Sequence, residues 1–187
     1  MTGQKIVTPS AQSLASAAQA ASKKGLPPVE KWNPPFCGDI DMRIARDGTW
    51  FYMGTPIGRH AMVKLFSGII RRDGDDYFLV TPVEKVRITV DDAPFVAIDF
   101  DVTPDGLLFT NNVGDQALAG ADHPIRMETD PETGEPSPYV LIRRNLWALI
   151  DRKSFYRLVD LAHVQGDHFG VTSGGAFFPL MAADALD

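Results

Sequence analysis

The residues best suited to chemistry in this sequence include an arginine and two aromatic side chains in one short segment, Arg43, Trp50 and Tyr52. An arginine can bind a phosphate or carboxylate group through two parallel hydrogen bonds, and tryptophan and tyrosine offer flat surfaces on which a base can stack. Two later arginines, Arg126 and Arg143, can add further positive charge. These five residues predict a binding site for a small anionic ligand, including ligands that carry a base and a phosphate.

The face on which the first three residues lie depends on a predicted hairpin over residues 40–53. Apolar residues at every second position of residues 40–44 indicate a half-buried strand, and Asp47-Gly48 is typical of a two-residue hairpin turn. If Arg46 pairs with Thr49, four apolar side chains share the core face: Met42, Ile44, Phe51 and Met53. The predicted ligand-binding side chains then share the opposite face, which contacts either a ligand or a neighbouring domain or strand.

Other groups of residues with catalytic potential have simpler interpretations. The carboxylate pairs Asp39 with Asp41 and Asp99 with Asp101 have the spacing of exposed strand residues and lie in no recognisable metal loop. The four histidines lack the spacing of a zinc site, and Cys37 has no helix start beside it to activate its thiol. Phosphate-binding glycine loops and the nucleophile elbow are missing from the sequence. We therefore expect no catalytic residue, no metal and no cofactor.

The composition is that of an ordinary globular protein. The chain has 187 residues, of which 44% are hydrophobic and 22% charged, and its formal net charge is −6. A negative chain is a poor partner for bulk nucleic acid, and no apolar run is long enough to span a membrane. The single cysteine cannot form an internal disulfide, and the first 25 residues lack the apolar core of a signal peptide. We expect a cytoplasmic protein.

The hydrophobic pattern predicts an α+β protein whose sheets are mainly antiparallel. Helices are expected near residues 10–22, 58–70 and 151–163, the last two with an apolar stripe that faces a sheet. Residues 130–138 have the composition of a polar, proline-rich loop. Beyond the first hairpin, short strands are expected at residues 77–81, 84–90, 95–102, 107–110, 139–143, 147–150, 169–172 and 176–180.

Short segments recur in the same order in the two halves of the chain, which indicates an internal duplication. The tetrapeptide PVEK occurs at residues 28–31 and 82–85, each time upstream of a strand, an Asp-Gly turn and a second strand. The apolar stripe of the helix at 58–70 aligns with that of the helix at 151–163, so we expect the two helices to occupy equivalent places. We predict an N-terminal helical segment over residues 1–25 and two related domains at residues 26–81 and 82–187, the second enlarged near residues 111–138.

Five segments of the chain have a recognisable pattern: RDGTWFYMGTPI, LVTPVEK, DDAPF, HPIR and FYRLVDL. Together they resemble the bacterial domain-of-unknown-function 1285 family, over nearly all of residues 26–180. The resemblance implies an internally duplicated, two-domain architecture whose second domain is similar to the pleckstrin-homology fold. It also implies a ligand site between the domains and a signalling role with a nucleotide-like ligand. It supplies no catalytic residues.

These observations favour a ligand-binding or signalling module that binds a small anionic ligand between its two halves. One alternative is a hydrolase that acts on a nucleotide or a phosphorylated small molecule through aspartate and arginine side chains. Another is an adaptor that binds an acidic protein partner, because basic residues are concentrated at 57–72 and 143–157.

Overall fold

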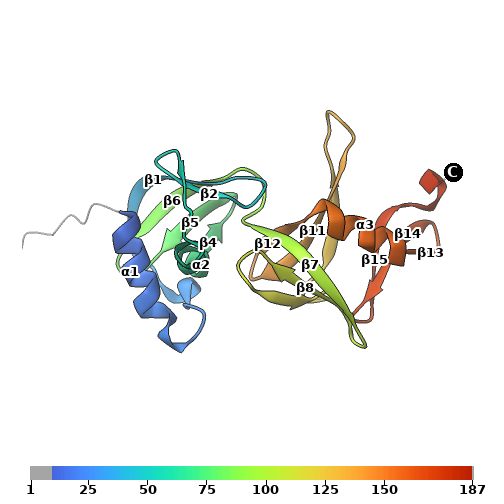
Figure 1. Ribbon diagram of the computed structural model, residues 1–187, viewed down its shortest axis with the longest axis horizontal. Helices are drawn as coiled ribbons and strands as arrows, with labels where there is room; N and C mark the ends of the chain where they lie inside the picture. Colours follow the sequence, from blue (N-terminus) through green and yellow to red (C-terminus); the bar gives the residue numbers. More distant parts are fainter. Residues whose placement is uncertain (1–9, 187) are drawn as a thin grey trace, which may run out of the picture. The chain divides into compact units, whose positions relative to one another are not determined.

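The computed structural model describes residues 10–186 and divides the chain into two compact units. The first unit comprises the chain up to Ala45 together with Thr49–Asp91, and the second comprises Arg46–Gly48 and the chain from Asp92 onward. Each unit contains a twisted six-stranded sheet and few helices (Figure 1). The expectation of two related α+β domains is confirmed.

The described part of the first unit contains two α-helices, α1 (Ala11–Ala21) and α2 (His60–Gly68). Helix α1 begins where the sequence predicts, because the side chains of Ser10 and Ser13 each accept a hydrogen bond from the other residue's backbone N–H group. Its buried residues, Leu14 and Ala18, lie one turn apart, and the helix packs against α2. Single turns of 3-10 helix follow α1 at Ser22–Lys24 and Val29–Lys31. The start of the expected segment, residues 1–9, lies outside the described residues.

The sheet of the first unit has the strand order β3-β2-β1-β6-β5-β4. Its strands are β1 Phe36–Ile44, β2 Trp50–Tyr52, β3 Thr55–Pro56, β4 Ile70–Asp73, β5 Asp76–Val80 and β6 Lys85–Val90. The central pair, β1 and β6, is parallel, and the other neighbouring pairs are antiparallel. Arg71, expected at the end of a helix, lies in β4 and donates hydrogen bonds to the carbonyls of Val29 and Trp32. Helix α2 therefore ends earlier than predicted, at Gly68.

The β1–β2 hairpin differs by one residue from the predicted register. Ile44 pairs with Trp50, because the turn contains three residues, Arg46–Gly48, and is closed by a hydrogen bond from the Ala45 N–H to the Thr49 carbonyl. The glycine that ends the turn has a φ of 90°, the left-handed conformation that a three-residue hairpin turn requires. A shift of one residue reverses the face of every side chain on the second strand.

The sheet of the second unit has the strand order β10-β11-β12-β7-β8-β9. Its strands are β7 Phe95–Thr103, β8 Gly106–Asn111, β9 Gln116–Leu118, β10 Ile125–Thr129, β11 Pro136–Arg143 and β12 Leu146–Ile150. Helix α3 (Arg152–Leu161) follows β12 and packs against β7. A separate three-stranded sheet follows, with β13 His163–Gln165, β14 His168–Ser173 and β15 Ala176–Ala182, and a 3-10 turn at Ala183–Leu186.

The turn between β14 and β15 anchors the three-stranded sheet to its neighbours. The buried hydroxyl of Ser173 accepts a hydrogen bond from the Leu107 N–H at 2.8 Å and donates one to the Ala119 carbonyl at 2.7 Å. Gly106 lies so close that an added Cβ would meet the Ser173 hydroxyl and lie 2.7 Å from the Gly174 nitrogen. This glycine therefore allows the close backbone approach that the contact requires.

The two six-stranded sheets share one topology. When the strands of each sheet are numbered in chain order, both have the spatial order 3-2-1-6-5-4, with strands 1 and 6 parallel. In both sheets an Asp-Gly dipeptide lies where the chain passes from the first strand to the second: Asp47-Gly48 in the turn of the first sheet, and Asp105-Gly106 in the second, where Gly106 begins β8. The helices do not correspond, because α2 connects the third and fourth strands whereas α3 follows the sixth. The expectation of equivalent helices is wrong. Any helix that covers a sheet has an apolar stripe, so the similar stripes of α2 and α3 do not show that the two helices occupy equivalent places.

The domain boundary expected after residue 81 precedes the last strand of the first sheet. Strand β6 pairs with β1 on one side and β5 on the other, and the division between the units falls between Asp91 and Asp92. The two PVEK copies also differ in structure, because Val29–Lys31 form a 3-10 turn whereas Lys85 begins β6. The identity of these tetrapeptides therefore marks no structural repeat.

Candidate functional site

The structure separates the three predicted site residues of the first hairpin. Trp50 is in the core, only 1% exposed, and its ring stacks on that of Phe66 in α2 with a centroid distance of 5.9 Å. Tyr52 pairs with the buried residue Met42 and is half-buried. Arg43 lies on the opposite face of β1, since it alternates with Met42 along the strand. The predicted grouping of Arg43 with Trp50 and Tyr52 on one face is therefore wrong.

Arg43 has partners within the first unit. Its guanidinium forms an ion pair with Asp91 and lies 4.5 Å from the centroid of the Phe51 ring, to which it is directly opposed in the β1–β2 pairing. Phe51 was expected in the core, and the shifted register places it beside Arg43 instead. Met53, the other residue expected in the core, is 67% exposed.

The two predicted arginines of the second unit have different surroundings. Arg126 in β10 is half-exposed, with its guanidinium 4.2 Å from the centroid of the Trp147 ring and 2.7 Å from the Glu128 carboxylate. The side chain of Arg143 in β11 is largely buried and lies 3.3 Å from the Asp115 carboxylate. Burial lowers the pKa of Arg143, and the nearby Asp115 opposes that shift. Arg126 is thus open to a ligand, whereas Arg143 serves the interior of the unit.

A pocket of about 520 Å³ lies in the second unit, where the start of β11, the end of β12 and the first turn of α3 meet. Two arginines, Arg46 and Arg152, and two aromatic residues, Phe155 and Tyr156, contribute to its walls. Tyr156 is 60% exposed, so its ring can lie against a bound molecule. The remaining lining residues are Glu135, Pro136, Ser137, Pro138, Leu149, Ile150 and Asp151.

An ion pair with Asp92 and a hydrogen bond to Ser137 hold Arg46 at this pocket. The Tyr139 hydroxyl donates to Asp92 Oδ1 at 2.7 Å, and the other Asp92 oxygen lies 3.0 Å from Arg46 Nη1. Arg46 Nη2 also donates to the Ser137 hydroxyl at 3.0 Å. Burial, together with the hydrogen bond to Asp92, raises the pKa of Tyr139 to about 12, so this hydroxyl remains a donor at physiological pH. These contacts fix the direction of the Arg46 guanidinium.

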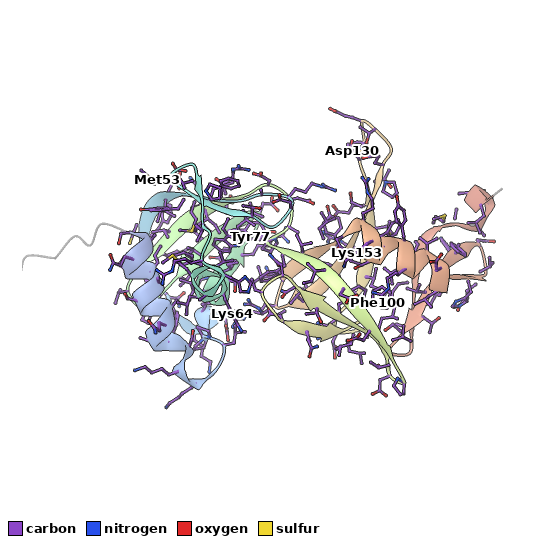
Figure 2. The ribbon with its side chains drawn as sticks, viewed as in Figure 1. Met53, Lys64, Tyr77, Phe100, Asp130 and Lys153 are labelled. Atoms are coloured by element: carbon purple, nitrogen blue, oxygen red, sulfur yellow. The ribbon has the colours of Figure 1, made fainter. Side chains whose placement is uncertain are left out.

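Helix α3 brings one basic side chain, that of Arg152, to the pocket at its first turn. Asp151 caps the helix by accepting a hydrogen bond from the Ser154 N–H at 3.0 Å. Arg152 and Lys153 follow immediately, and Figure 2 shows Lys153 on the first turn of this helix. The partial positive charge of a helix N-terminus disfavours cations there, so two basic residues at these positions oppose the usual preference. Departures of this kind from local stability rules are expected at functional positions.

The β10–β11 hairpin gives the pocket its remaining wall. Figures 1 and 2 show this hairpin extending from the second sheet, with Asp130 in its turn. The Asp130 carboxylate accepts hydrogen bonds from the Glu132 and Thr133 N–H groups, which lower its pKa, and the Asp130 N–H donates to the Glu135 carbonyl at 2.9 Å. Of the segment expected to be a polar loop, residues 130–135 form a hydrogen-bonded turn that sets the backbone position of Glu135, whereas residues 136–138 belong to β11.

Sequence reasoning did not select the residues that line this pocket. Arg152 follows an N-cap aspartate at a position where acidic residues are usual, and that inversion is a signal available in the sequence. Arg46 and Glu135 each lie in or beside a turn, so their approach to the pocket depends on tertiary contacts that no local pattern predicts. The aromatic neighbour of Arg43 is Phe51 and not Trp50 or Tyr52, and Arg126 has an aromatic contact with Trp147 that the sequence does not predict.

A second pocket, of about 300 Å³, lies in the first unit. Carboxylates of Asp39, Asp75 and Asp76 line it, and Arg87 is bound there by Asp39 through two hydrogen bonds of 2.8 and 3.0 Å. The excess of negative charge makes this pocket unsuited to an anionic ligand. Within residues 10–186, we find no cluster of three or more potential metal-ligating side chains and no helix long and apolar enough to cross a membrane.

Comparison with known proteins assigns both units. The family model for the N-terminal domain of DUF1285, a domain of unknown function, matches residues 27–93, and the model for the DUF1285 C-terminal domain matches residues 94–180. The crystal structure of a DUF1285 family protein from Silicibacter pomeroyi DSS-3 is 61% identical, with a TM-score of 0.86 over 92% of this chain and 97% of that one. A DUF1285 family protein from Shewanella baltica OS155 is 32% identical, with a TM-score of 0.51 over 64% of this chain and 90% of that one. No curated protein matches the chain. The chain therefore belongs to the DUF1285 family.

Proposed function

We propose that the protein binds a small anionic ligand in the pocket formed by the β10–β11 hairpin, the end of β12 and the first turn of α3. The observation that carries the proposal is the convergence of two arginines and two aromatic side chains on a pocket of about 520 Å³. That volume is in the range of small-molecule sites, which combine mostly apolar walls with a few polar groups that orient the ligand.

The charges and surfaces of the pocket support an anionic group joined to an apolar or planar body. The guanidinium of Arg152 is exposed to solvent, and that of Arg46 is held in place by Asp92 and Ser137. Arginine binds carboxylate and phosphate groups with two parallel hydrogen bonds, which gives direction as well as charge. The ring of Tyr156 and the side chain of Leu149 provide a surface for the rest of the ligand.

We include Arg126 in the proposed binding site. In the strand register Arg126 lies opposite Tyr139, and Tyr139 lies opposite Leu149, so all three share one face of the sheet. Leu149 itself lines the pocket. Of the five residues predicted from the sequence, Arg126 thus retains a role in binding, whereas Trp50 and Arg143 support the interior of their units. We place this binding module in the cytoplasm, where the exposed thiol of Cys37 stays reduced.

The proposal is tested by calorimetric titration with nucleoside monophosphates and aromatic carboxylic acids, using the full chain and the variant Arg152→Gln. Arg152→Gln removes one charged partner of the ligand, and we expect it to weaken binding about ten-fold, as the loss of one charge-assisted hydrogen bond does. Arg59→Gln is the matched control, because Arg59 is an exposed arginine at the start of α2, in the other unit.

Equal affinities for Arg152→Gln and the unmodified protein would contradict this location of the site. Absence of binding for every compound that carries an anionic group, amino acids included, would contradict the proposed function itself. A gain in melting temperature with ligand gives an independent readout, because saturation at about 100 times Kd adds roughly 2.7 kcal/mol to the free energy of unfolding.

A further inference from the structure

We infer that the ligand of this pocket is amphoteric, with a protonated amino group in addition to its anionic group, as in an amino acid that has an aromatic or large apolar side chain. The inference rests on the proposed function, because it concerns the same pocket. It adds a second recognition element, the carboxylate of Glu135, and names the chemical class that fits both charges.

Four ionised side chains line the pocket, two of each sign: Arg46, Arg152, Glu135 and Asp151. Two of them are compensated by neighbours. Arg46 lies 3.0 Å from the carboxylate of Asp92, and Asp151 caps α3 and lies 3.3 Å from the ammonium group of Lys153. The charges of these two residues are therefore already balanced within the protein.

The other two side chains are available to a ligand. Within residues 10–186, neither the guanidinium of Arg152 nor the carboxylate of Glu135 forms an ion pair. One pocket thus presents one uncompensated positive group and one uncompensated negative group. A purely anionic ligand would satisfy Arg152 and meet repulsion from Glu135, whereas a ligand with both signs of charge satisfies both.

Hydrogen bonds and helix capping fix the backbone on each side of the pocket, so the backbone positions from which these two side chains extend are defined. The Glu135 N–H donates to the Thr133 hydroxyl at 3.2 Å, and the Glu135 carbonyl accepts from the Asp130 N–H at 2.9 Å. Arg152 is the first residue of α3, directly after its capping residue. A fixed backbone removes part of the entropy cost of binding, and the ordering of the two exposed side chains remains to be offset by their contacts with the ligand.

The rest of the pocket wall selects the body of the ligand. Phe155, Tyr156 and Leu149 provide aromatic and apolar surface, and Pro136 and Pro138 add rigid apolar edges. An amino acid with an aromatic side chain matches this wall, with its carboxylate at Arg152 and its ammonium group at Glu135.

The test compares three probes of similar size by calorimetric titration of the full chain: phenylalanine, N-acetylphenylalanine and phenethylamine. N-acetylphenylalanine keeps the carboxylate and lacks the amino charge, and phenethylamine keeps the amino charge and lacks the carboxylate. We expect phenylalanine to bind about five-fold or more tightly than either probe, because each lacks one charged contact at a partly exposed site.

The variant Glu135→Gln is expected to remove most of the preference for phenylalanine over N-acetylphenylalanine. Glu132→Gln is the matched control, since Glu132 is an exposed glutamate in the same turn that does not line the pocket. Equal binding of phenylalanine and N-acetylphenylalanine, or binding of nucleotides and carboxylic acids without binding of phenylalanine, would overturn the inference and leave the proposed function intact. Binding of phenethylamine alone, or of no compound in either panel, would overturn both.

Discussion

Replacing Trp50 by alanine tests the observed register of the first hairpin. The side chain is 1% exposed and stacks on Phe66, and both residues are among the largest fully buried side chains of the chain. Truncation of a buried tryptophan removes its transfer free energy and leaves a cavity that the surrounding core fills only in part. We expect Trp50→Ala to lower the free energy of unfolding by about 3–5 kcal/mol.

The effect is measured by denaturing the protein with urea and monitoring unfolding by far-ultraviolet circular dichroism. Trp147→Ala provides the matched comparison, because Trp147 is half-buried in the second sheet and its removal is expected to cost clearly less. A loss below about 1 kcal/mol for Trp50→Ala would refute the observed register, because surface substitutions away from special features fall in that range. It would instead support the two-residue turn, in which Trp50 faces away from the core.

Three further predictions follow from single positions in the structure. Burial raises the pKa of Glu84 above 4.5, only partly opposed by a hydrogen bond from Ser13, so the folded state binds a proton more tightly than the unfolded state. The free energy of unfolding should therefore fall as the pH rises from 4.5 through the raised pKa. Urea titrations at several pH values should show a smaller fall for Glu84→Gln than for the unmodified protein. The same dependence of stability on pH in both proteins would contradict this. Gly106→Ala should lower the free energy of unfolding of the second unit by about 2 kcal/mol or more, because the Cβ of the alanine would meet the Ser173 hydroxyl and Gly106 has a φ of 142°. A thermal melt that matches that of the unmodified protein would argue against this close approach. Arg152→Gln should leave the free energy of unfolding unchanged or raise it by about 1 kcal/mol or less, since the helix dipole disfavours a cation there. A clear loss of stability in a urea titration would show that Arg152 is structural.

The sequence predicts the three α-helices and most strands of the described residues because these carry a local periodic pattern, but it does not predict β3, β4, β9, β10 and β13. Strands such as β6 and β7 alternate or run apolar over their length, and α1 begins at a serine that can cap it. Both sheets also have an Asp-Gly dipeptide where the chain passes from the first strand to the second, and this part of the predicted duplication corresponds to the shared topology.

Errors arose where one residue or one tertiary contact decides the outcome. The three-residue turn at Arg46–Gly48 has the same Asp-Gly dipeptide as a two-residue turn, so the hairpin register could not be read from the dipeptide alone. The predicted end of α2 is too late, because Arg71 lies in β4, where it donates hydrogen bonds to the carbonyls of Val29 and Trp32, two residues that are distant in sequence. Local pattern contains no information on such partners.

The candidate site was harder to predict than the fold. The arginines chosen from the sequence were those beside aromatic residues or in strands, but Arg143 is buried beside Asp115 and Arg43 is paired with Asp91. Arg152 and Glu135 come from a helix start and a hairpin that approach one another only in the folded second unit. The inversion of charge at the start of α3 was the one local signal for this pocket.

The most direct test of the proposed site is a heteronuclear NMR titration of the isotope-labelled full chain with adenosine monophosphate and with phenylalanine. For at least one of these probes, saturable shifts of backbone amide signals should concentrate at pocket-lining residues that have an amide proton, among them Arg46, Glu135, Ser137, Arg152, Phe155 and Tyr156. The same shifts should be absent or strongly reduced in Arg152→Gln. Saturable shifts confined to the acidic pocket around Asp39 and Arg87, or no saturable shift with either probe, would contradict the account.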